Sequence, residues 1–164
     1  MLLSKIKFGV VGLVLTLIAA CGFSPVYGPD ETAKTFLNKV SIAAPTDKKS
    51  YDLVRQLETR LGRTDEAPYV LRYNLTTSED SLAITSTQDV TRYHVLGTVT
   101  FTVVDRETGA VQYSGSVKNF TGYATTGTVV STRSSQEDAY KRLMVILADQ
   151  MTTRLMTAMR NGNT

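Results

Sequence analysis

The chain has 164 residues, with 18 basic and 15 acidic side chains, one histidine, one cysteine and no tryptophan. A net charge of +3 without a dense Lys/Arg block excludes a nucleic-acid site built on a basic cluster. One histidine and one cysteine are too few for a metal or catalytic site made mainly of these residues, and the length suits a single domain with its own core.

The first twenty residues are typical of a secretory signal. Lys5 and Lys7 form a short basic region, and a run of apolar or small residues follows from Phe8 to Ala20. This run is shorter than the roughly 20 apolar residues that a membrane-spanning helix needs. We predict that residues 1–20 are removed, which leaves 144 residues with 16 basic and 15 acidic side chains and a net charge of +1.

Cys21 follows this segment directly, and three roles compete for it: a free thiol, a metal or catalytic ligand, and an attachment point. The run Ile18-Ala19-Ala20-Cys21 is similar to a bacterial lipobox, in which small residues admit the signal peptidase and the cysteine thiol carries diacylglycerol. The preceding residues therefore favour lipid attachment at Cys21. Several acyl chains hold a protein stably to a membrane, whereas a single chain binds only marginally. The alternative is an ordinary signal peptide that is cut elsewhere.

A tether, a strand and a helix are predicted next. Residues 21–35 contain two prolines and lack periodicity, so we expect an extended tether there, a domain over residues 36–161 and a frayed tail over 162–164. The run "FLNKVSIAAP", residues 36–45, predicts a short strand. The run "DKKSYDLVRQLETRLGR", residues 47–63, has apolar residues at helical spacing, with Ser50 as the predicted N-cap and Gly62 as the C-terminal stop.

The middle of the chain alternates between apolar and polar residues. Residues 69–77, 92–105 and 111–123 each place apolar side chains on one face, and Gly109 lies in a predicted hairpin turn. Leu82–Val90 is an uncertain strand or edge, and Gly115 indicates a bulge or a close approach. Together these segments predict an antiparallel meander with one apolar face.

The longest helix is predicted near the C-terminus, after a looser stretch over residues 124–133. Ser134 and Glu137 match a capping box, and an apolar stripe follows from Ala139 to Ala158. The order of elements predicts an α+β fold: a two-layer sandwich whose mainly antiparallel sheet of about four strands carries two helices on one face.

The opposite sheet face is predicted to be bare and rich in hydroxyl groups. One interpretation is an ordinary solvated face, and the other is a surface for a polar partner or an anionic ligand. Its predicted residues are Arg72, Asn74, Thr76, Arg92, His94, Thr98, Thr100, Thr102, Gln112, Ser114, Ser116 and Lys118.

Catalytic patterns are missing from the sequence. It has no H-E-x-x-H, no G-x-S-x-G and no glycine-rich phosphate loop, and His94 is expected to be an ordinary surface residue. The pair Glu79-Asp80 is expected to lie in a turn. We therefore predict no enzymatic activity, no metal and no cofactor.

The segment "CGFSPVYG", residues 21–28, resembles the start of the LptE family of lipopolysaccharide-assembly lipoproteins in its alphaproteobacterial form. The specific part of this resemblance is Phe23, Pro25, Tyr27 and Gly28, whereas the rest of the chain resembles the family only in architecture.

The resemblance implies a partner rather than a reaction. Family members sit in the lumen of the large outer-membrane β-barrel LptD, help it assemble and assist delivery of lipopolysaccharide to the outer leaflet. A polar exterior over a rigid core is compatible with a water-filled barrel. Arg92, Lys118 and Arg133 are then candidate contacts for phosphate or sugar groups of lipopolysaccharide, the alternative being that these cations only serve solubility. Gly22 is not the aspartate that retains lipoproteins in the inner membrane, so outer-membrane sorting is expected, with the domain facing the periplasm and lying within the barrel.

Two other functions compete with this interpretation. The first is an auxiliary lipoprotein subunit of another envelope transport system, which would have no barrel partner. The second is a small envelope enzyme, which would need a pocket with convergent polar groups.

Overall fold

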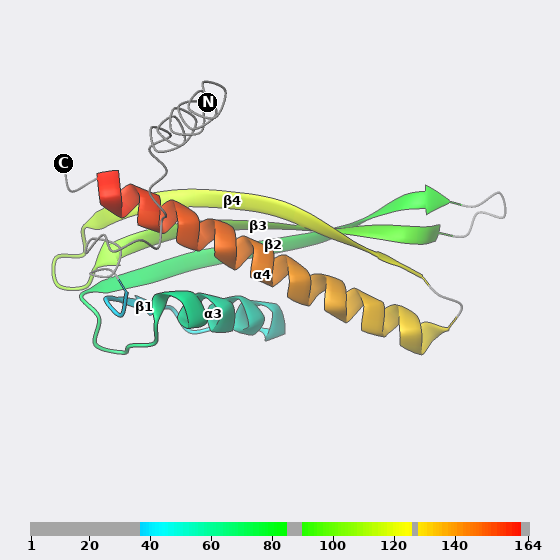
Figure 1. Cartoon of the computed structure of the whole chain (residues 1–164), viewed down its shortest axis with the longest axis horizontal. Helices are drawn as coiled ribbons and strands as arrows, with labels where there is room; N and C mark the ends of the chain where they lie inside the picture. Colours follow the sequence, from blue (N-terminus) through cyan, green and yellow to red (C-terminus); the bar gives the residue numbers. More distant parts are fainter. Residues whose placement is uncertain (1–36, 85–89, 126–127, 162–164) are drawn as a thin grey trace, which may run out of the picture. The chain divides into compact units, whose positions relative to one another are not determined.

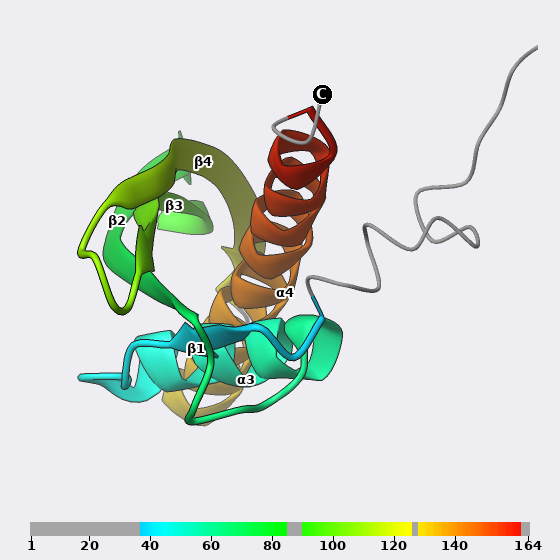
Figure 2. The same cartoon turned by 90° about the vertical axis from the view of Figure 1, so that its left-hand side faces the viewer.

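The computed structural model describes residues 37–84, 90–125 and 128–161, all within the unit Glu31–Thr164. The predicted α+β class is confirmed: a four-stranded sheet in the order β1-β2-β3-β4 carries both helices on one face (Figures 1 and 2). The elements are β1 (Val40–Ile42), α3 (Lys48–Leu61), β2 (Tyr69–Ile84), β3 (Val90–Asp105), β4 (Val111–Ala124) and α4 (Val129–Asn161).

The sheet is antiparallel except at one edge. β1 pairs in parallel with β2, with Val40 opposite Tyr69, and α3 supplies the crossover that a parallel pair requires. The predicted meander from β2 to β4 is confirmed. Leu82–Val90 is not a strand of its own, because pairing with β3 continues through Ser81 and carries β2 on to Ile84. Val90 then begins β3, and residues 85–89 lie outside the described residues.

The capping residue of α3 differs from the prediction. Asp47, not Ser50, is the N-cap: Asp47 Oδ1 accepts a hydrogen bond of 2.7 Å from the Ser50 amide. Ser50 Oγ in turn accepts one of 2.9 Å from the Asp47 amide, which completes a capping box with Ser50 in the third helical position. Gly62 is the C-cap as predicted, with a φ of 88° that favours glycine.

The long helix α4 begins at Val129, five residues before the predicted cap Ser134. Thr128 Oγ1 accepts a hydrogen bond of 3.3 Å from the Ser131 amide, so Thr128 caps the N-terminus of the helix in place of Ser134. The first turn carries Val129 and Val130, which are exposed and break the apolar periodicity on which the prediction relied. The helix has 33 residues, about 50 Å at 1.5 Å per residue.

The core lies between the sheet and the two helices. A side chain at Gly97 of β3 would place its Cβ 2.9 Å from Leu147 Cδ1, so glycine lets α4 close onto the strand. A Cβ at Gly115 would lie 2.8 Å from Phe101 Cζ, which agrees with the predicted close approach there. The buried apolar residues include Leu53, Leu57 and Leu61 of α3, Leu71, Val95, Val99, Phe101, Val103 and Val117 of the sheet, and Leu143, Leu147, Met151 and Leu155 of α4.

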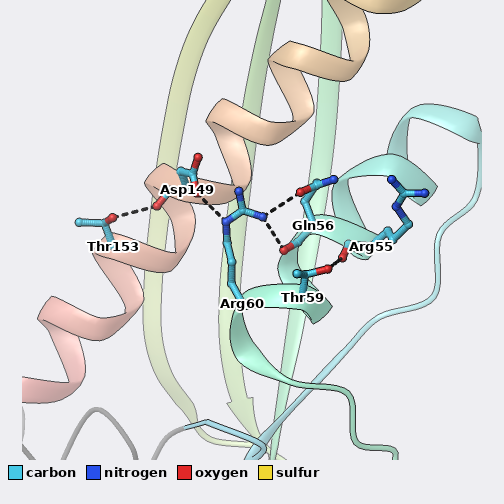
Figure 3. A network of polar contacts seen from close by, with 6 residues as sticks. All are labelled: Arg55, Gln56, Thr59, Arg60, Asp149 and Thr153. Carbon is cyan, nitrogen blue, oxygen red and sulfur yellow. Dashed lines mark hydrogen bonds and ion pairs between the residues drawn. The ribbon is translucent and has the colours of Figure 1, made fainter. Parts of the chain in front are cut away.

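A polar contact joins the two helices at the C-terminal end of α3 (Figure 3). Arg60 Nε lies 2.5 Å from Asp149 Oδ1, and the guanidinium also donates to the Gln56 carbonyl at 2.8 Å. The Arg60 side chain is only 19% exposed, so its charge is partly desolvated and benefits from both acceptors.

β4 forms the second edge of the sheet. Between Ser114 and Ala124, its even-numbered residues turn their backbone groups away from β3, because pairing alternates along an antiparallel strand. Two of these groups are bound from within the chain: the Phe120 amide donates to Asn119 Oδ1 at 2.8 Å, and Arg142 of α4 donates to the Gly122 carbonyl at 3.0 Å.

Candidate functional site

The sheet face opposite the helices, here called the outer face, carries most of the residues that the sequence predicted for it. The register sets polar side chains beside one another in rows across three strands: Arg72–Thr102–Ser114, Asn74–Thr100–Ser116 and Thr76–Thr98–Lys118. Gln112 falls at a register shift beside Tyr113 and lies outside these rows. Hydroxyl groups can accept or donate, so these rows can satisfy many polar partners.

The outer face differs from the prediction in two respects. Glu79 and Asp80 lie inside β2 rather than in a turn, and Asp80 sits opposite His94 on the outer face. The next row holds Leu96 and Phe120, and Phe120 is 56% exposed. The outer face therefore carries a carboxylate and an apolar pair beside its hydroxyl groups.

The three cations proposed as ligand contacts do not form one site. On the outer face, Lys118 lies opposite Thr98 and Arg92 opposite Ala124. These positions are six residues apart along the strands, or about 20 Å. Arg133 belongs to α4, in the helical layer that covers the other face of the sheet. Cys21 lies outside the described residues.

Arg133 lies instead beside a cleft of about 380 Å³ between α3 and α4, here called the α3–α4 cleft. Glu137 is held between two cations, 3.4 Å from Lys48 Nζ and 3.6 Å from Arg133 Nε. Lys141 lines the same cleft and forms no ion pair with another described residue. The lining consists of Lys48, Lys49, Asp52, Arg133, Gln136, Glu137, Tyr140 and Lys141, so four cations meet two carboxylates and the cleft favours an anion.

Beside this cleft, Glu79 organises a partly buried polar cluster on the inner face of the sheet. Tyr123 donates to Glu79 Oε2 at 3.1 Å, and Gln136 Nε2 donates to Glu79 Oε1 at 2.7 Å. Burial first, and then the Glu79 carboxylate, raises the pKa of Tyr123 and of Tyr140 to about 12. Both phenols stay protonated near neutral pH, which suits structural hydrogen bonding rather than proton transfer.

Sequence reasoning missed Glu79, although the alternation of β2 contained the signal. Tyr73, Leu75 and Glu79 share one parity, so extending the strand by four residues places the carboxylate on the helix-covered face. The two neighbouring acids had indicated a turn, and this local pattern concealed the strand.

The described residues contain neither a group of metal ligands nor a membrane-spanning helix. No group of three or more His, Cys, Asp or Glu residues that could hold a metal ion occurs in residues 37–84, 90–125 and 128–161. Among the helices of this described part, none is both long and apolar enough to cross a membrane.

The family model for lipopolysaccharide assembly, LptE, matches residues 37–155, which span the sheet and nearly all of both helices. The chain belongs to the LptE family. It is therefore an assembly lipoprotein rather than an enzyme, as the sequence predicted. Comparison with curated protein sequences gives no match.

Solved structures of bacterial lipoproteins share this LptE fold. A lipoprotein from Caulobacter crescentus superposes with a TM-score of 0.68 at 17% identity, covering 79% of this chain and 96% of the other. Rare lipoprotein B from Shewanella oneidensis superposes with a TM-score of 0.57 at 15% identity, covering 77% of this chain and 98% of the other. A minor lipoprotein from Acinetobacter baumannii superposes with a TM-score of 0.59 at 23% identity, covering 74% of this chain and 92% of the other. At these identities the likeness establishes the fold.

Proposed function

We propose that this LptE-family protein is an outer-membrane lipoprotein that occupies the lumen of an LptD β-barrel, supports assembly of that barrel and assists delivery of lipopolysaccharide to the outer leaflet. The family match over residues 37–155 carries this proposal. From the same family match we infer that the domain faces the periplasm and lies within the barrel.

The distribution of polar groups supports a place inside a barrel. Both helices cover the apolar face of the sheet, so the large side chains of the core are buried. The outer face presents threonine and serine rows instead. The lumen of an outer-membrane barrel is polar, and a surface rich in hydroxyl groups can exchange water for polar wall groups at little cost in free energy.

The N-terminal segment supports membrane attachment. Lipidation at Cys21 would anchor the mature chain, and Gly22 favours sorting to the outer membrane. The run "CGFSPVYG" at residues 21–28 supports the alphaproteobacterial form of the family.

Lipopolysaccharide would meet cations on two separate surfaces. Arg92 and Lys118 lie on the outer face, whereas Arg133 lines the α3–α4 cleft together with three lysines. Phosphate groups bind guanidinium and ammonium groups through charge-assisted hydrogen bonds. The cleft concentrates more positive charge than either outer-face cation, so Arg133 is the first of the three to mutate.

A mild-detergent pull-down of the acylated protein from outer membranes tests the proposal. We expect a large β-barrel to co-purify in a one-to-one ratio. Recovery of the lipoprotein alone, or with an inner-membrane transporter, would overturn the proposal and favour an auxiliary subunit of another transport system. Arg133→Ala should leave the barrel ratio unchanged and reduce the lipopolysaccharide that co-purifies, while Arg63→Ala, at an exposed site beyond α3, serves as the charge-matched control.

A further inference from the structure

Phe120 is an exposed aromatic residue in the middle of a polar surface. The residue is 56% exposed, and its ring centroid lies 4.8 Å from that of His94, with 41° between the ring planes. This contact holds the ring in a defined position on the outer face while more than half of the residue stays accessible. An ordered, accessible ring loses little conformational freedom when a ligand binds to it.

The neighbours of Phe120 change from apolar to charged within one row in either direction. Phe120 lies opposite Leu96. On one side the next row contains Lys118, and on the other side it contains His94 between Gly122 and Asp80. Gly122 has no side chain, so the edge of the His94 imidazole beside it stays uncovered. The result is a small apolar platform between a cation and a carboxylate.

The size of this platform decides what kind of ligand fits. A stable protein interface buries about 800 Å² on each partner, with aromatic anchors inside an apolar centre. Leu96 and Phe120 are only two side chains, and a phenylalanine contributes about 150–250 Å². The platform is therefore the size of one ring rather than of a protein interface.

A sugar ring matches this chemistry. One face of a pyranose carries C–H groups with partial positive charge, which meet the negative face of an aromatic ring. Its hydroxyl groups both donate and accept, as the mixed set of Lys118, Asp80 and His94 around the ring requires.

We propose that Phe120 and His94 form the stacking platform of a saccharide-binding site on the outer face, with Lys118 and Asp80 as its hydrogen-bonding neighbours. The source of the saccharide, the sugar portion of lipopolysaccharide, rests on the proposed function. The stacking role of Phe120 is separate from any phosphate contact of the cations.

Titration of the acylated mature protein with dephosphorylated core oligosaccharide tests the site, because removing phosphate eliminates binding through phosphate groups alone. Saturation-transfer NMR should detect sugar C–H protons against the protein. Phe120→Ala should weaken binding about ten-fold, and Phe120→Tyr should keep most of it. The matched control is Tyr51→Ala on α3, because Tyr51 is 55% exposed and lies away from the sheet. Its affinity should equal that of the wild type.

Three outcomes would overturn the inference: no binding by the wild type, equal binding by Phe120→Ala, or equal losses in the Phe120 and Tyr51 variants. A Phe120→Ala variant that binds the oligosaccharide normally but loses the barrel would show that a protein wall covers the platform, which also overturns it. The pull-down separates this inference from the proposed function, because Phe120-dependent sugar binding without a co-purifying barrel would refute the barrel and retain the platform.

Discussion

The phenol of Tyr123 on β4 donates a hydrogen bond of 3.1 Å to Glu79 Oε2 on β2, across the intervening strand β3. Gln136 of α4 binds the other carboxylate oxygen at 2.7 Å. One carboxylate thus connects two strands that are not neighbours with the long helix. A polar group in this position specifies how α4 lies on the sheet, since apolar contacts alone are non-directional.

Replacing Glu79 by alanine should lower the free energy of unfolding by about 1–3 kcal/mol, because the Tyr123 hydroxyl and the Gln136 amide lose their acceptor. Urea denaturation followed by circular dichroism measures the loss. Asp80→Ala is the control: the neighbouring carboxylate lies on the outer face, and its removal should change stability by less than about 0.5 kcal/mol. Equal losses in the two variants would show that the cluster contributes nothing of its own.

Stability should fall at alkaline pH. The pKa of Tyr123 and of Tyr140 is about 12 in the folded chain against an ordinary value of 10.0, so the folded state retains protons that the unfolded state releases. The stabilisation is complete below pH 10 and is lost as the pH rises from 10 towards 12. The urea midpoints of unfolding at closely spaced pH values give the slope of stability against pH. Tyr123→Phe should flatten it, whereas Tyr51→Phe should leave it intact, and an unchanged slope in Tyr123→Phe would contradict the assignment.

Gly97→Ala should destabilise the fold by about 1–3 kcal/mol, because the new methyl group would crowd Leu143 and Leu147 where α4 packs on β3. Thermal unfolding followed by circular dichroism gives the decrease in unfolding temperature. Thr98→Ala changes the next residue, which faces the opposite side of the sheet, and should have a smaller effect. A variant as stable as the wild type would mean that α4 moves away from the sheet without cost.

The cap of α3 should make stability depend on pH in acid. The hydrogen bonds from the side chain and the backbone of Ser50 hold the pKa of Asp47 below its ordinary value of 3.8. This stabilisation is present above that value and is lost as the pH falls through the lower folded value. Asp47→Ala should cost about 1 kcal/mol at neutral pH, whereas Asp47→Asn keeps the acceptor and should cost less while removing the acid dependence of this cap. Urea unfolding at neutral and acidic pH distinguishes the variants, and identical acid profiles for the wild type and the Asp47→Asn variant would refute the role of the carboxylate.

Mass spectrometry of the mature N-terminus should show a lipid-modified Cys21, since the preceding run has the pattern of a lipobox. Cys21→Ser should abolish acylation and release the protein from the membrane fraction. An unmodified cysteine, or cleavage at another residue, would refute lipid attachment.

Alternation along the strands predicted most of the sheet, because Tyr73 or Thr100 can only point to one of two faces once the strand is assigned. The parallel pairing of Val40 with Tyr69 depended on contacts distant in sequence, which no local pattern encodes. Both helices begin before the residues predicted as their N-caps, because a single side chain determines which residue caps a helix. Asp47 and Thr128 precede residues that resemble caps themselves, and the exposed Val129 hides the first turn of α4.

The candidate site was harder to predict than the fold. The outer-face positions of Arg92 and Lys118 followed from strand parity, but their separation required the register between β3 and β4. The α3–α4 cleft brings Lys48 beside Arg133, which are far apart in the sequence, so only the packing of the helices reveals it. Strand parity places Phe120 on the same face as Lys118, but its contact with His94 required the register between β3 and β4.

The hydrogen bonds that Asn119 and Arg142 make at the edge of β4 lower the tendency of this edge to aggregate. A bare strand edge is a template on which other chains add strands and aggregate. Occupying the Phe120 amide and the Gly122 carbonyl from within the molecule interrupts that template at two successive outward-facing positions. Along this segment the strand edge is thereby less able to accept a strand from another chain.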